Sequence, residues 1–166
     1  AKAIARNLRA EYPTQLYTST LQRARETARI VACELRIKPV VDRRLNELHF
    51  GKWEGSYYRR LAQEAGKDFR RWREGTLTRP PEGESISCLG RRVGQFLKEI
   101  LNRHPEETVA VISHGGPIKM LLFKVLRAQC SIWSFRIDPA SISLIEGNGH
   151  LLQIVWTNRL DHLNPR

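Results

Sequence analysis

The run Thr108-Val109-Ala110-Val111-Ile112-Ser113-His114-Gly115-Gly116-Pro117 indicates how this chain folds. Its first five residues are apolar or β-branched without interruption, which is typical of a strand covered on both faces. Pro117 suits the first turn of a helix. A buried strand that leads through a short loop into a helix predicts an α/β domain with a mostly parallel sheet.

Other segments of the chain alternate between strand-like and helix-like patterns. We expect strands at 16–18 and 39–41, and helices at 2–8, at 21–35 with Ser19 or Thr20 as the cap, at 56–74, and around Leu89 to Leu101. Segments 141–146 and 151–157 flank Gly147-Asn148-Gly149, which is a hairpin signal. The sequence therefore predicts a three-layer sandwich, in which helices flank a mostly parallel sheet that ends in a C-terminal hairpin.

The composition limits the kinds of partner. The 166 residues include 28 Lys and Arg against 17 Asp and Glu, a formal charge of +11, which suits anionic partners such as nucleic acid or phosphorylated metabolites. No apolar run approaches the ~20 residues that a membrane span requires, and the N-terminus lacks the basic-then-apolar layout of a secretory signal, so we expect neither. Cys33, Cys88 and Cys130 are odd in number and widely spaced, which indicates reduced thiols. We expect a soluble cytoplasmic protein.

His114 is the strongest candidate for a functional residue. In open α/β sheets the ligand crevice lies beyond the carboxyl ends of the strands, and a helix N-terminus at that place attracts anions. His114 lies between the predicted strand and the predicted helix, and Gly115 and Gly116 let the backbone approach a ligand closely. This pattern favours a ligand-binding histidine over one that only packs in a core.

Arg23 and Glu47 are weaker candidates. Arg23 places a cation in the first turn of a helix, which is unfavourable unless an anion joins it there. Glu47 lies in a loop, where a carboxylate near an anion site would have a raised pKa and could donate a proton. Taken alone, a solvated arginine and an exposed acid remain alternatives for these two residues.

Four runs in this order resemble the histidine phosphatase superfamily, also called phosphoglycerate-mutase-like, and especially its α-ribazole-phosphatase-like bacterial branch. They are Ser19 to Thr27, Glu47-Leu48-His49-Phe50-Gly51-Lys52-Trp53-Glu54-Gly55, Pro80-Pro81-Glu82-Gly83-Glu84-Ser85 and Ser113-His114-Gly115-Gly116. The resemblance implies a phosphatase for small phosphomonoesters that forms a phosphohistidine and needs no metal or other cofactor. It implies that Arg23, His114 and Gly115 bind the phosphoryl group, and that Glu47 protonates the leaving oxygen.

The beginning of the chain departs from the family pattern. Family members begin with a strand that leads into an Arg-His-Gly motif, whose histidine is the nucleophile, and residues 1–166 contain no such motif. We therefore expect a single domain over 1–166 that is N-terminally incomplete, without the phosphoryl acceptor, the first pocket arginine and one core strand. The oligomeric state is left open.

Two other classes of function stay open at this point. Phosphoglycerate mutase activity is an alternative, because a phosphohistidine can return its phosphoryl group to another hydroxyl. The other class is a module without catalysis, which binds either phosphate or, through the arginines of helix 56–74, nucleic acid. For a phosphatase we expect helix 56–74 to form a small cap beside the site, with four apolar residues turned toward the body: Tyr57, Leu61, Phe69 and Trp72.

Overall fold

The centre of the fold is a parallel sheet of three short strands. In the computed structural model, which describes residues 1–147 and 151–163, β1 (Gln15–Thr18) lies between β2 (Pro39–Val41) and β3 (Val109–Ile112). Thr18 is in register with Val41 on one side and with Ile112 on the other. The carboxyl ends of the three strands therefore meet at one edge, as the sequence predicted.

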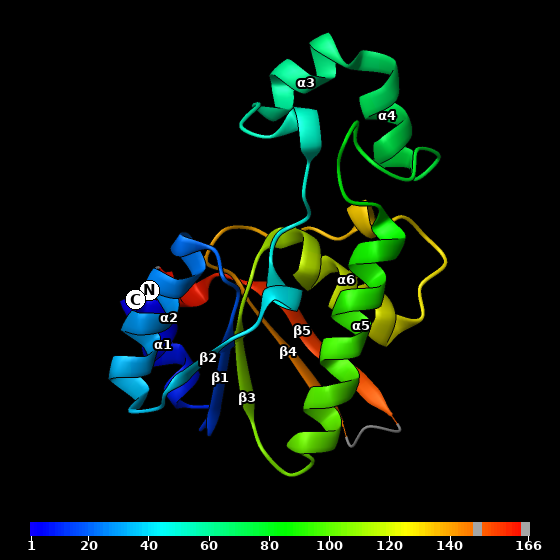
Figure 1. The fold of residues 1–166 in the computed structure, drawn as a ribbon. Helices are drawn as coiled ribbons and strands as arrows, with labels where there is room; N and C mark the ends of the chain where they lie inside the picture. The colour runs from blue at the N-terminus through cyan, green and yellow to red at the C-terminus, as the bar shows by residue number, and fades with distance from the viewer. Residues whose placement is uncertain (148–150, 164–166) are drawn as a thin grey trace.

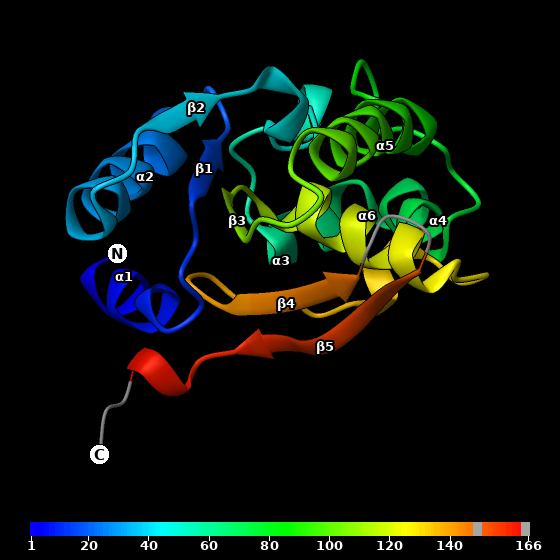
Figure 2. The same ribbon diagram turned by 90° about the horizontal axis from the view of Figure 1, so that it is seen from below.

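Helices cover both faces of this sheet. Figure 2 shows α1 (Lys2–Arg9) and α2 (Gln22–Leu35) on one side, and α5 (Ile86–Arg103) and α6 (Gly115–Leu126) on the other. Side chains of a strand alternate between the two faces. Leu16 accordingly packs against α1 and α2, whereas Tyr17 packs against Phe96 and Ile100 of α5. The three layers confirm the predicted α/β fold.

The predicted hairpin is present as a separate antiparallel pair. It consists of β4 (Ile142–Gly147) and β5 (Leu152–Arg159), and α6 packs against β5. Asn148 and Gly149 of the predicted turn lie outside the described residues. Within 1–147 and 151–163, β3 pairs only with β1, and β4 pairs only with β5. Ala110 is consequently the only fully buried residue of β3, which was predicted to be covered on both faces.

The predicted helix over 56–74 is two helices, α3 (Tyr58–Glu64) and α4 (Gly66–Glu74). The break at Ala65 fits the low helix propensity of Gly66. Together the two helices form a lobe beyond the carboxyl ends of the parallel strands (Figure 1). Leu61, Phe69 and Trp72 are buried as predicted. The prediction for Tyr57 was wrong, because this residue precedes α3 in an extended conformation and is 84% exposed.

Two helix starts also differ from the prediction. Helix α2 begins at Gln22 without a side-chain cap, because Thr20 donates hydrogen bonds to Asn46 and the Ser19 hydroxyl faces His114. Helix α6 begins at Gly115, so Pro117 is its third residue. The described residues also form four short 3-10 helices: η1 (Arg43–Leu45), η2 (Gly51–Trp53), η3 (Ile132–Ser134) and η4 (Asp161–Leu163).

Candidate active site

His114 lies where β3 ends and α6 begins, and it is 8% exposed. Its Nδ1 accepts a hydrogen bond from Nε of Arg23 at 3.2 Å, and its Nε2 lies 2.7 Å from Oγ of Ser19. A guanidinium can only donate, so Nδ1 carries the lone pair. The imidazole proton is therefore on Nε2 and is donated to Ser19.

The electrostatic surroundings keep the His114 ring neutral. Burial lowers the pKa of His114 to about 4, and the positive charges of Arg23 and Arg92 act in the same direction. Three cationic or polar elements thus meet at this place: a guanidinium, a neutral imidazole and the N-terminus of α6. A bound anion would offset the positive charge of Arg23, so protonation of the His114 ring would become less unfavourable.

Glu47 lies at the N-terminus of α6, beside His114. Its Oε1 accepts hydrogen bonds at 2.9 Å from the backbone N–H groups of Leu48 and Gly116. Burial raises the pKa of Glu47, although these two hydrogen bonds and the charges of Arg23 and Arg92 oppose the rise. A Cβ atom on Gly116 would lie 2.4 Å from Oε1, so only glycine leaves room for the carboxylate here.

Arg23 is the second residue of α2 and is exposed to solvent. Together with Glu47 it lines a cavity of about 860 Å³, and His114 is not among the lining residues. Two direct hydrogen bonds hold the site together, one between Arg23 and His114 and one between Gly116 and Glu47. Gly115 is the first residue of α6 and lies between these contacts. The structure thus brings the four predicted site residues together at the carboxyl edge of the sheet.

Sequence reasoning missed the residue that holds the Glu47 loop. Nη1 of Arg92 donates to the carbonyl oxygens of Arg44 and Asn46 at 2.6 and 2.7 Å, and Nη2 donates to that of Glu47 at 3.3 Å. The same guanidinium forms a two-pronged ion pair with Glu84. Arg92 is on α5, 45 residues from Glu47. The only trace of this arrangement in the sequence was Glu84, within the run from Pro80 to Ser85.

The pKa of His114 predicts how the stability of the domain depends on pH. The unfolded chain binds a proton on this ring near pH 6.5, whereas the folded chain binds it near pH 4. The free energy of unfolding should therefore decrease by about 1–2 kcal/mol between pH 7 and pH 5 on account of His114. Urea denaturation of the wild type and of His114→Gln at both pH values measures this term, because the variant should lack it.

His49→Gln is the matched control, since it makes the same substitution at an exposed histidine. An equal decrease in the wild type and in His114→Gln would contradict the assignment.

Comparison with known proteins identifies the family. A sequence profile described as "Histidine phosphatase superfamily (branch 1)" matches residues 1–159. Phosphoserine phosphatase 1 of Hydrogenobacter thermophilus is 33% identical over 165 residues, which cover 98% of this chain and 78% of the relative. The adenosylcobalamin/alpha-ribazole phosphatase of Escherichia coli is 29% identical over 132 residues, which cover 78% of this chain and 65% of the relative.

The solved structures agree with this result. YhfR from Bacillus stearothermophilus superposes with a TM-score of 0.86 at 30% identity, over 98% of this chain and 82% of that one. The family and the phosphatase names of its relatives support hydrolysis of phosphomonoesters. The match over nearly the whole chain shows that this protein belongs to the histidine phosphatase superfamily, branch 1.

Proposed function

We propose that the domain hydrolyses small phosphomonoesters through a phosphohistidine intermediate. Arg23, His114 and the N–H of Gly115 bind the phosphoryl oxygens, and Glu47 is the proton donor to the leaving oxygen. The observation that carries this proposal is the direct contact of Arg23 with His114 beside the N-terminus of α6. Such a cluster of donors suits the charge that spreads over three oxygens during phosphoryl transfer.

The proposed reaction has two steps. A ring nitrogen of a histidine attacks phosphorus, the ester P–O bond breaks, and the leaving oxygen takes the proton of Glu47. Water then attacks the phosphohistidine, inorganic phosphate leaves, and the Glu47 carboxylate takes a proton from that water. Residues 1–166 contain no Arg-His-Gly run. The proposed reaction therefore needs an accepting histidine from outside residues 1–166.

The electrostatics of Glu47 support its role as the acid. Burial raises its pKa, and a carboxylic acid must keep its proton near the working pH in order to donate it. The bound phosphoryl group would add negative charge nearby and raise this pKa further. Arg23 limits the effect, since its charge favours the carboxylate.

We propose a small phosphorylated molecule, rather than nucleic acid, as the partner. Two arginines of the lobe already have carboxylate neighbours, since Arg60 pairs with Glu64 and Arg71 with Asp68.

We also propose a cytoplasmic location, because Cys33, Cys88 and Cys130 are exposed free thiols, which fits a reducing compartment. In the part of the chain that the structure describes, no helix combines the length and the apolar character of a membrane span.

Release of inorganic phosphate from a phosphomonoester tests the proposed function. Residues 1–166 alone should release phosphate no faster than buffer, because they lack the accepting histidine. The protein with an upstream strand that ends in Arg-His-Gly should be active, and His114→Ala in that form should lose at least tenfold in kcat/KM. Robust turnover by residues 1–166, or an active form that tolerates His114→Ala, would refute the proposal.

A further inference from the structure

The segment 80–85 leads from the lobe into α5 and packs against the loop that carries Glu47. The backbone N–H of Glu84 donates to the carbonyl oxygen of His49 at 2.8 Å. A Cβ atom on Gly83 would lie 2.7 Å from the same oxygen, so a larger residue here would collide with the backbone of the loop. The two segments are therefore in direct backbone contact, although they are more than 30 residues apart in the sequence.

The side chains of Glu84 and Arg92 extend this contact to Glu47. Oε1 of Glu84 lies 2.7 Å from Nε of Arg92, and Oε2 lies 2.8 Å from Nη2. The two side chains are only 18% and 19% exposed. Because the carboxylate binds one edge of the planar guanidinium, it turns Nη1 toward the loop, where Nη1 donates to two carbonyl oxygens. Nη2 also donates to the carbonyl oxygen of Glu47 itself.

The charge of Arg92 also acts on the site. Burial has the largest effect on the pKa of Glu47 and on that of His114, and the positive charge of Arg92 lowers both values. Glu84 balances this charge from the side of Arg92 that faces the segment 80–85. Other charged or titratable groups close to the Glu47 carboxylate come from α2 and α6: Arg23, His114 and Lys119.

We propose that Glu84 and Arg92 are positioning residues for Glu47, and that through them the segment 80–85 keeps the proton donor directed at the leaving oxygen. This inference rests on the proposed function, because the position of Glu47 affects the rate in this way only if it donates a proton. In this role neither residue reacts with the substrate, and both act through the loop. The segment 80–85, which has no part in the proposed reaction, thereby joins the lobe to the proton donor.

Loss of the Glu84 carboxylate should weaken the acid in two ways. The guanidinium of Arg92 would lose the partner that orients it, so the Glu47 loop could shift, and a displacement of about 1 Å can slow a reaction by about 10²-fold. The positive charge of Arg92 would also be unbalanced, which favours the carboxylate form of Glu47 that cannot donate a proton. The first effect changes the rate, and the second changes the pH at which Glu47 titrates.

The titration of Glu47 can be measured in residues 1–166. Carbon NMR detects the side-chain carboxyl groups of the glutamates, and Glu47→Gln identifies the Glu47 signal by its absence. In Glu84→Gln this signal should titrate at a lower pH than in the wild type, because the charge of Arg92 is no longer balanced. Arg92→Lys retains the positive charge, so Glu47 should titrate close to its wild-type pH.

Glu82→Gln is the matched control for Glu84→Gln. It makes the same substitution in the same segment, but Glu82 is exposed and pairs with the exposed Lys52 at 2.7 Å. An exposed ion pair contributes little, so this variant should leave the titration of Glu47 and the rates on both esters unchanged.

Kinetics of the active form of the protein give the second measurement. Glu84→Gln and Arg92→Lys should each lower kcat for glycerol 3-phosphate by about tenfold or more, with KM within about threefold, because the proton is needed in the transition state and not for binding. The rate on 4-nitrophenyl phosphate, whose leaving group needs no proton, should decrease less than about threefold. Both changes together should cost little more than either alone, because the two residues act as one unit.

The outcomes separate this inference from the proposed function. Far-UV circular dichroism checks the fold of each variant, and if Glu84→Gln is unfolded, Arg92→Lys alone decides the test on the two esters. An unchanged titration of Glu47 in folded Glu84→Gln, or equal slowing of both esters, overturns the positioning role and leaves the proposed reaction intact. If Glu47→Gln itself slows both esters equally, the proposed reaction loses its proton donor, and the role of Glu84 and Arg92 is overturned with it.

Discussion

Replacing Glu47 with glutamine should slow the hydrolysis of an alkyl phosphate by about 10²–10⁴-fold in the active form of the protein. Glutamine keeps the shape of the side chain, and its carbonyl oxygen can still accept hydrogen bonds from Leu48 and Gly116. The change therefore removes the transferable proton while leaving the loop in place. Steady-state kinetics with glycerol 3-phosphate measures the effect.

The leaving group distinguishes a proton donor from a residue that only shapes the site. Nitrophenolate leaves readily without protonation, so 4-nitrophenyl phosphate should be slowed less than tenfold by Glu47→Gln. The wild-type rate on the alkyl ester should also decrease as Glu47 loses its proton at high pH, above the ordinary carboxyl range because burial raises its pKa. The variant should lack this decrease.

Glu54→Gln is the matched control for this experiment. Glu54 lines the same cavity as Glu47 but is exposed, and it should tolerate the change with little loss on either ester. Equal slowing of both esters in Glu47→Gln would contradict a role in protonating the leaving oxygen, and would leave Glu47 as a residue that positions the N-terminus of α6.

The central layers of the fold were predictable because their signals are local. A short strand such as Gln15–Thr18 must send successive side chains to opposite faces, and Leu16 and Tyr17 do so. The apolar spacing in 21–35 and around Leu89 to Leu101 likewise places one face of each helix on the sheet. The break at Ala65 was not predictable from spacing, because the apolar period continues from Leu61 to Phe69 through a residue of low helix propensity.

The candidate site was predictable where its residues directly follow strands. Arg23 and His114 both come shortly after parallel strands, so the topology alone brings them to one edge of the sheet. Arg92 gave no such signal. It lies inside a regular helix, and its role depends on the approach of a distant segment, the Glu47 loop.

Ser19 illustrates how a local rule can give the wrong partner. A serine before a helix is a favourable cap, and the sequence predicted that role for it. In the fold its hydroxyl lies 2.7 Å from the ring of His114, 95 residues away, and it also accepts a hydrogen bond from Leu21. The parallel pairing of β1 with β3 brings these two residues together, and no sequence window of helix length contains both.

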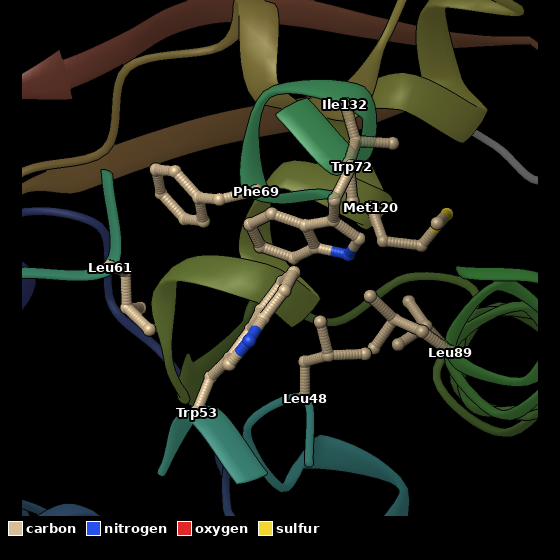
Figure 3. Close-up of a cluster of buried hydrophobic side chains, with 9 residues drawn as sticks. Leu48, Trp53, Leu61, Phe69, Trp72, Leu89, Met120 and Ile132 are labelled. Atoms are coloured by element: carbon tan, nitrogen blue, oxygen red, sulfur yellow. The ribbon is translucent and has the colours of Figure 1, made fainter. Parts of the chain in front are cut away.

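Trp72→Ala should destabilise the protein by about 3–5 kcal/mol, the largest effect on stability that we expect from a single side chain. Trp72 is 2% exposed and contacts four aromatic rings, with centroid distances from 4.1 Å to Trp133 to 6.0 Å to Phe69. Figure 3 shows its indole between the lobe and side chains of the main body such as Leu48 and Met120. Alanine would leave a cavity at the junction of the two parts.

The polar atom of this indole sharpens the prediction. Nε1 of Trp72 is buried and has no hydrogen-bond partner among the described residues, so the N–H group contributes a desolvation cost and no bond. Trp72→Phe should therefore cost much less than Trp72→Ala, since it removes the unsatisfied group together with only part of the volume. Tyr57→Ala is the control within the same lobe, and its 84% exposed side chain should contribute less than about 0.5 kcal/mol. Urea denaturation measures the free energy of unfolding of each variant. If Tyr57→Ala or Trp72→Phe loses as much stability as Trp72→Ala, this indole does not hold the lobe to the body.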